Sequence, residues 1–205
     1  MIKKLINRLT IQPINRRGFT LVEMMIVLAI FSVTTVVIVD IFMMASKASR
    51  RTLAIERVQS DARYSLEAVA REIRMDMIYY DWSGYAGGIA APEDELALKD
   101  ADDNLIIFKK SVNDCPSGTT NCLVVSLDGG VTWASITSKG NNVEDLKFYI
   151  DPAVDPFKVN EQYTYNSDNQ PRVTIVLVTK GVGGRPDEQQ TIYLQTTISN
   201  RIYRR

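Results

Sequence analysis

The hydrophobic pattern divides the chain into a long helical part and a later part made of short strands. Residues 19–44 read FTLVEMMIVLAIFSVTTVVIVDIFMM, with no charged residue between Glu23 and Asp40. A helix over this stretch would be roughly 39 Å long at about 1.5 Å per residue, which is enough to cross the hydrocarbon of a bilayer. The pattern therefore predicts a membrane-spanning helix over residues 19–44.

Residues 45–80 show an amphipathic pattern. Apolar side chains recur every three or four positions, at Ile55, Val58, Ala62, Leu66, Val69, Ile73 and Met77. This spacing places them on one face of a helix, and no proline or glycine occurs from Phe19 to Ser83. One helix is therefore predicted from about residue 19 to 80, with a stripe that packs on the chain's own domain. A coiled-coil seam is the alternative, but the stripe lasts only about three heptads.

Residues 81–205 alternate between β-branched apolar runs and turn signals. The predicted strands are residues 105–110, 123–127, 131–136, 143–150, 172–180 and 189–199. Asp128-Gly129-Gly130 is a hairpin signal, and a glycine-rich turn at 181–186 joins the last two runs. These patterns predict an α+β fold in which one antiparallel sheet packs on the stripe of the long helix.

Charge and composition exclude several kinds of function. The chain has 24 basic residues, 24 acidic residues and no histidine. The first 18 residues hold five of the basic ones and no acidic one, so the remainder carries a net charge of −5. An acidic body is a poor match for nucleic acid, and the missing histidine excludes His-based triads and His-ligated metals. We expect no enzyme activity, no catalytic residues, no cofactor and no metal site.

The amino-terminal segment permits three interpretations. Ser46-Lys47-Ala48 is a possible signal-peptidase site, but the apolar run is too long for a secretory signal. Arg16-Arg17 suggests a twin-arginine signal, to which the same objection applies. In the third, basic residues lead into Gly18, and Phe19-Thr20-Leu21-Val22-Glu23 and an apolar stretch follow. This segment resembles the prepilin peptidase signature of type IV pilin-like proteins.

The resemblance implies roles for three residues. A prepilin peptidase would cut after Gly18 and methylate the new amino group of Phe19. Glu23 would pair with the amino-terminal charge of a neighbouring subunit, since a lone carboxylate at membrane depth needs a partner. A position in the headgroup layer without any partner is the alternative for Glu23. The implied divisions are a leader (1–18), a transmembrane half-helix (19–44), an amphipathic half-helix (45–80) and a β-rich domain (81–205).

Three later segments resemble W-type minor pilins and J-type pseudopilins. They are VQSDARYSLEAVAREIRM in the helix, VEDLKFYID, and the carboxyl-terminal TIYLQTTISNRIYRR. The resemblance implies the pilin-like fold and a minor pilin or pseudopilin of a type IV pilus or a type II secretion system. A low-copy subunit is favoured because no proline lies in the membrane half of the helix. An adhesin, a DNA-uptake pilin and a membrane-anchored enzyme are the rivals.

The same resemblance implies partners and a location. The partners are the prepilin peptidase, other minor pilins or pseudopilins, the major pilin, the inner-membrane assembly platform and membrane lipid, with no nucleic acid. Basic residues before the span favour a cytoplasmic amino terminus. The protein is therefore expected to cross the inner membrane once, with its carboxyl-terminal domain in the periplasm, before it joins a pilus or pseudopilus.

Two further groups of residues suggest local chemistry. Cys115 and Cys122 bracket the short polar loop CPSGTTNC, and a disulfide between them is expected outside the cytoplasm. The acidic run around Asp100 and Asp103 suggests calcium. It does not match the EF-hand pattern, because Leu105 stands where that pattern needs glycine.

Overall fold

The computed structural model describes residues 18–85, 88–89, 92–159 and 169–201. The chain divides into two units, one ending at Ser46 and the other beginning at Lys47, and each is described by itself. One helix, α1 (Leu21–Met75), belongs to both units, and all of the strands belong to the second. The expected α+β class is therefore correct: a long helix joined to antiparallel β-structure.

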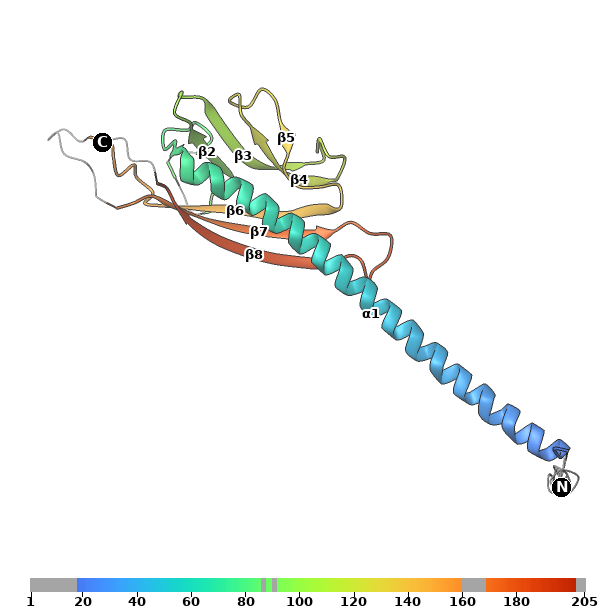
Figure 1. Cartoon of the computed structure of the whole chain (residues 1–205). Helices are drawn as coiled ribbons and strands as arrows, with labels where there is room; N and C mark the ends of the chain where they lie inside the picture. The colour runs from blue at the N-terminus through green and yellow to red at the C-terminus, as the bar shows by residue number, and fades with distance from the viewer. Residues whose placement is uncertain (1–17, 86–87, 90–91, 160–168, 202–205) are drawn as a thin grey trace, which may run out of the picture. The chain divides into compact units, whose positions relative to one another are not determined.

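The second half of α1 packs on the sheets through the predicted stripe (Figure 1). Val58, Ala62, Leu66, Val69 and Ile73 are all at most 7% exposed. Burying these side chains is what fixes the helix to its domain, since each fully buried aliphatic chain contributes about 1.5–3 kcal/mol.

The helix ends at Met75, five residues before the predicted end. Asp76 makes the last helical hydrogen bond, to the carbonyl of Glu72 at 2.8 Å. The next residues instead form β1 (Met77–Ile78), which pairs with the strand that follows it in sequence. No glycine or proline lies at the end of the helix. The helix ends here because the following residues pair with β2.

The first sheet has five strands in the order β1-β2-β3-β4-β5, each antiparallel to its neighbour. After β1, its strands are β2 (Glu95–Lys99), β3 (Leu105–Val112), β4 (Asn121–Ser126) and β5 (Ala134–Ser135). The hairpin expected around Asp128 joins β4 to β5, but β5 is much shorter than predicted. Val131 is 80% exposed and lies in the loop.

The second sheet has three antiparallel strands in the order β6-β7-β8. They are β6 (Asn141–Asp151), β7 (Arg172–Gly181) and β8 (Thr191–Ser199). A register shift between Val143 and Asp145 places an extra residue in β6. This bulge explains why Val143 and Leu146, three residues apart, are both buried on the same side.

The prediction of a single sheet was wrong. Within the described residues, an isolated antiparallel bridge between Glu93 and Phe148 links the two sheets. Phe108 from the first sheet and Phe148 from the second lie in one hydrophobic core with Val69 and Ile73 of α1. The helix stripe is thus shared by two sheets, which an alternating pattern in the sequence does not reveal.

Strand β2 was not among the strands predicted from the sequence. Leu96, Ala97 and Leu98 are fully buried. The hydroxyl of Tyr85, itself buried, accepts a hydrogen bond from the Ala97 amide at 2.9 Å. Tyr79, Tyr80 and Trp82, which follow the helix, are partly buried and pack against the same hydrophobic core.

Candidate assembly site

The expected processing position lies on an open stretch of chain. Gly18 and Phe19 are exposed and precede α1, and a Cβ atom built on Gly18 would meet no atom within 4 Å. The rest of the expected leader, including Arg16 and Arg17, lies outside the described residues. Both residues that flank the expected cleavage site are therefore exposed to solvent.

Thr20 caps the amino terminus of α1. The Glu23 amide donates a hydrogen bond to the Thr20 hydroxyl at 3.2 Å, and the Met24 amide donates to the Thr20 carbonyl at 3.2 Å. Thr-x-x-Glu is the spacing of a capping box, a signal that sequence reasoning overlooked. Glu23 therefore lies in the first turn, where the helix dipole favours a carboxylate. Glu23 therefore favours the start of the helix, in addition to its expected role in assembly.

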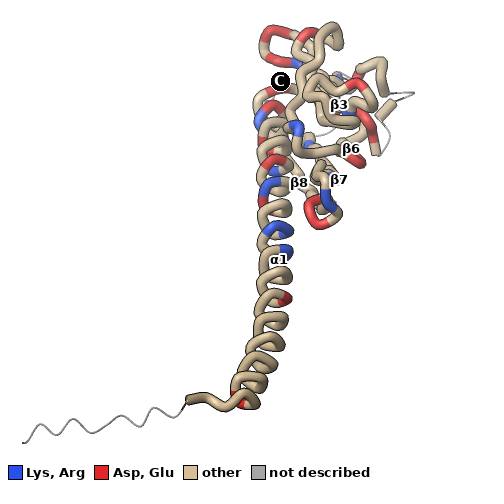
Figure 2. Tube along the Cα trace, turned by 90° about the vertical axis from the view of Figure 1, so that its right-hand side faces the viewer, with Lys and Arg blue, Asp and Glu red and all other residues tan. Residues whose placement is uncertain are grey.

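The first half of α1 is apolar on all sides. Figure 2 shows that this part carries almost no charged residues, whereas the later part carries many. Its large side chains are exposed, from 47% at Met24 to 76% at Leu21. By length and composition this helix qualifies to cross a membrane, and none of its most apolar window is buried within the protein.

The hydroxyl groups in this apolar half are satisfied within the helix. Ser32, Thr34 and Thr35 each donate a hydrogen bond to a main-chain carbonyl three or four residues earlier, at 2.8 Å. In hydrocarbon an unsatisfied polar group costs several kcal/mol, so this arrangement suits a lipid surrounding. Glu23 and Asp40 are the charged groups that remain in the segment.

A family model described as the prokaryotic N-terminal methylation motif matches residues 14–39. The match joins Gly18, Phe19 and Glu23 to the apolar half of α1. Over these residues the chain is similar to proteins that carry this motif, which supports a type IV pilin-like protein. The motif implies processing by a prepilin peptidase and partners among other pilins, and it fits membrane anchoring with pilus assembly. Neither the curated proteins nor the solved structures give a match to the chain.

The β-domain contains a disulfide. Cys115 and Cys122 are joined in the loop between β3 and β4, with their Cα atoms 5.9 Å apart. The loop is also closed by main-chain hydrogen bonds, from Asn113 to Thr120 at 2.6 Å and from Gly118 to Cys115 at 2.8 Å. Closing so short a loop contributes about 2–3 kcal/mol to stability.

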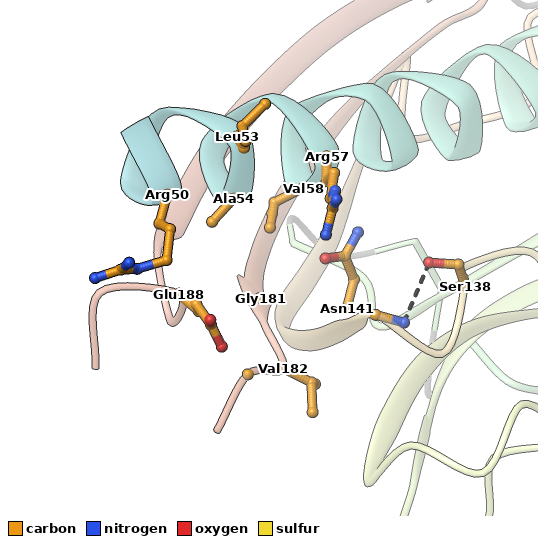
Figure 3. Close-up of a pocket in the computed structure, with 12 residues that line it drawn as sticks. Arg50, Leu53, Ala54, Arg57, Val58, Ser138, Asn141, Gly181, Val182 and Glu188 are labelled. Atoms are coloured by element: carbon orange, nitrogen blue, oxygen red, sulfur yellow. Dashed lines mark hydrogen bonds between the residues drawn. The ribbon is translucent and has the colours of Figure 1, made fainter. Parts of the chain in front are cut away.

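A pocket of about 450 Å³ lies between α1 and the turn that joins β7 to β8 (Figure 3). We call it the basal pocket. Arg50, Arg57 and Val58 line it from the helix, and Val182 and Glu188 line it from the turn. Sequence reasoning identified the glycine-rich turn but did not place it against the helix.

Two contacts hold this turn against the helix. Arg50 Nε lies 3.4 Å from Asp187 Oδ2, and Arg51 Nε donates to Gln190 Oε1 at 3.2 Å. A Cβ on Gly181 would approach the Glu188 carbonyl to 2.8 Å and Val58 to 2.9 Å, so glycine permits the close approach. The first residues after the apolar span are thereby tied to the start of β8.

Asp61 connects the helix to the start of β6. Its Oδ2 accepts hydrogen bonds from Asn141 Nδ2 at 2.6 Å and from the Ser138 amide at 3.2 Å. The four-residue spacing on the helix would instead allow an ion pair with Arg57. Asp61 contacts the β-domain because the side chain is half-buried there, and two donors compete better than one solvated cation.

The Asp100 carboxylate stabilises the turn between β2 and β3. Its Oδ1 accepts from the amides of Asp102 and Asn104, both at 2.8 Å, and its Oδ2 accepts from the Asn104 side chain at 2.8 Å. These hydrogen bonds, first that from the Asn104 side chain, lower the pKa of Asp100. Within the described residues no group of three His, Cys, Asp or Glu side chains could hold a metal, so the calcium idea gains no support.

The carboxyl groups of Glu72 and Asp76 interact at the carboxyl-terminal end of α1. Asp76 is 7% exposed, and its Oδ2 has no hydrogen-bond partner in the described part of the chain. Burial, followed by the charge of Glu72 and a hydrogen bond to it, raises the pKa of Asp76 to about 6. Asp100 adds a smaller repulsion. Asp76 is therefore a buried acid that is charged at neutral pH at a cost in stability.

Proposed function

We propose that this protein is a minor pilin that joins the initiating or tip complex of a type IV pilus. The observation that carries the proposal is the match to the methylation motif at residues 14–39, followed by an unbroken helix from Leu21 to Met75. The absence of proline from the membrane half of that helix supports a low-copy subunit over the bulk filament subunit. The work of such a subunit is noncovalent assembly, not catalysis.

The proposal assigns a role to each residue at the start of the mature chain. The peptidase cuts after Gly18 and methylates the amino group of Phe19, and Glu23 offsets the amino-terminal charge of a neighbour. The protein waits in the inner membrane with its β-domain in the periplasm and then joins other minor pilins, the major pilin and the assembly platform. Support comes from the basic leader, the exposed apolar half-helix and the disulfide, which suits an oxidising compartment.

A pseudopilin of a type II secretion system is the second candidate. The resemblance of the VEDLKFYID segment and the carboxyl-terminal segment to J-type pseudopilins favours it. Deleting the gene distinguishes the two candidates. We expect surface pili and pilus-dependent motility to be lost while secreted enzymes are still released. Loss of enzyme release with intact pili would assign the protein to secretion instead.

Replacing Gly18 by valine is expected to block processing. The structure leaves space for a side chain at this position, so a failure would report on the peptidase cleft and not on misfolding. Mass spectrometry of the membrane form should show an N-methylated Phe19 start for the wild type and an uncleaved chain for Gly18→Val. Phe19→Leu is the matched control and should still be cleaved. A wild-type mature terminus at Ser49 would support signal-peptidase cleavage and contradict the assignment.

A further inference from the structure

A second pocket lies in the β-domain, next to the carboxyl-terminal end of α1, and we call it the junction pocket. Its volume is about 300 Å³. Ligand sites in proteins span roughly 300–1,000 Å³, so this one suits a single side chain or a small molecule. Its lining comes from residues 77–81, Lys99, Asp155, Phe157, Pro171 and Asn200. Asp81 is exposed, so the pocket opens to solvent.

Aromatic side chains form much of the wall. Tyr79, Tyr80 and Phe157 all line the junction pocket. The Lys99 ammonium lies 4.4 Å from the centroid of the Tyr79 ring. An aromatic face attracts a cation because its π-electrons are negative there. The pocket thus already contains one contact between a cation and an aromatic ring.

The charged lining residues are Asp81, Asp155 and Lys99, which give a net charge of −1. Asp81 pairs with Lys158 at 3.3 Å, but these side chains are 71% and 60% exposed, and such a solvated pair is weak. One Asp155 oxygen accepts a hydrogen bond from the Phe157 amide at 2.9 Å, which orients the carboxylate and leaves its charge in place. The charge of the lining therefore favours a cationic occupant over an anionic one.

The Tyr80 hydroxyl is the second polar feature of this pocket. It is buried and has no hydrogen-bond partner in the described part of the chain. Burial, followed by the charge of Asp155 and smaller contributions from Tyr85 and Asp151, raises the pKa of Tyr80. Buried polar groups in folded proteins almost always have a partner. A ligand that donates an N–H to the Tyr80 oxygen would supply the missing one.

We propose that the junction pocket receives an arginine side chain from a different pilin-like subunit. The guanidinium group is planar and carries five N–H donors, so it can stack on an aromatic ring while it donates to other groups. Asp155 and Tyr80 supply the acceptors, and the aromatic wall supplies the stacking surface. A lysine ammonium is not planar and cannot stack in this way. The inference rests on the proposed function, because that function supplies pilin-like neighbours.

Binding of a small probe to the full chain in detergent is the first test. Saturation-transfer NMR compares N-acetyl-argininamide with N-acetyl-citrullinamide, which has the same shape and no charge. We expect the arginine probe to bind at least roughly tenfold more tightly. Tyr80→Phe keeps the ring but removes the acceptor, and Asp155→Asn keeps an oxygen for the Phe157 amide but removes the charge. Each should weaken binding of the arginine probe roughly tenfold.

Tyr64→Phe is the matched control, because Tyr64 is 67% exposed and does not line this pocket. It should bind the arginine probe as the wild type does. Urea unfolding separates lost binding from misfolding. The Tyr80 hydroxyl has no partner in the isolated chain, so Tyr80→Phe should be at least as stable as the wild type.

Co-purification from the native membrane is the second test. Tyr80→Phe and Asp155→Asn should each recover roughly tenfold less of a partner that carries an N-terminal methylation motif, and Tyr64→Phe should recover the wild-type amount. Equal binding of the two probes, unchanged binding by Tyr80→Phe, or a second copy of this chain as the partner would each overturn the inference. If the arginine probe binds but both variants recover pilins normally, the inference fails and the proposed function stands. If the wild type recovers no pilin at all, both fail.

Discussion

Glu23→Ala should remain folded and processed but fail to enter filaments. The expected loss of co-purification with partner pilins and sheared filaments is roughly tenfold or more, equivalent to losing an ion pair that contributes about 1.4 kcal/mol. In a low-dielectric surrounding a carboxylate and an amino-terminal charge attract one another far more strongly than in water. The variant also loses the cost of burying the carboxylate in lipid, which favours retention in the membrane.

The structure separates this role from capping of the helix. The Glu23 contact with Thr20 is made by the main-chain amide, which alanine retains. Thr20→Val is therefore the matched control: it removes the cap but keeps the carboxylate, and we expect it to assemble. Asp40→Asn removes the other acidic group of the apolar segment and should also assemble.

Cleavage after Gly18 and folding of the β-domain are to be checked for each variant. Normal incorporation of Glu23→Ala would contradict the assembly role and leave Glu23 as a residue of the headgroup layer. Failure of Thr20→Val together with Glu23→Ala would instead indicate that the first turn of α1 is what filaments require.

Asp76→Asn is expected to stabilise the protein at neutral pH. Because the pKa of Asp76 in the folded protein is about 6, above its usual 3.8, the folded state holds the proton more tightly than the unfolded state. The stabilisation from that proton is present below about pH 4 and is lost as the pH rises towards 6. Asparagine keeps the group neutral throughout and can donate to Glu72. At pH 7 the gain should be about 3 kcal/mol, from a shift near two pKa units at about 1.4 kcal/mol each.

Urea unfolding of the full chain in detergent, followed by tryptophan fluorescence, measures this effect. The difference between variant and wild type should be close to zero at pH 4 and reach its full size above pH 6. Glu56→Gln changes an exposed acid on the same helix and serves as the control. A difference that does not change between pH 4 and pH 7 would show that protonation of Asp76 is not its source.

The processing motif and most strands could be predicted because their signals are local. The run from Gly18 to Glu23 is contiguous, and the stripe from Val58 to Ile73 follows the helical period, so neither needs a tertiary contact to be recognised. Strands β3, β6, β7 and β8 were found from alternation between turn signals, with ends differing by only a few residues.

The features that sequence reasoning missed depend on partners far away in the chain. The end of α1 at Met75 depends on the pairing of Met77 with Lys99, and strand β2 is recognisable only from its neighbours. The split into two sheets depends on which strand edges meet, and β-patterning is the same in both arrangements. Asp61 accepts a hydrogen bond from Asn141, which is distant in the sequence, and does not pair with Arg57 one helical turn earlier.

By itself, the sequence predicted a membrane-compatible helix that begins with a processing motif, and a β-rich domain, because short-range periodicity and a contiguous motif encode both. Tertiary structure alone decided where the glycine-rich turn lies and which residues line the junction pocket. Each of these depends on contacts such as Arg51 with Gln190, which join residues more than a hundred positions apart. Such contacts form because burial and hydrogen bonding are optimised over the whole domain, and no local window of sequence contains both partners.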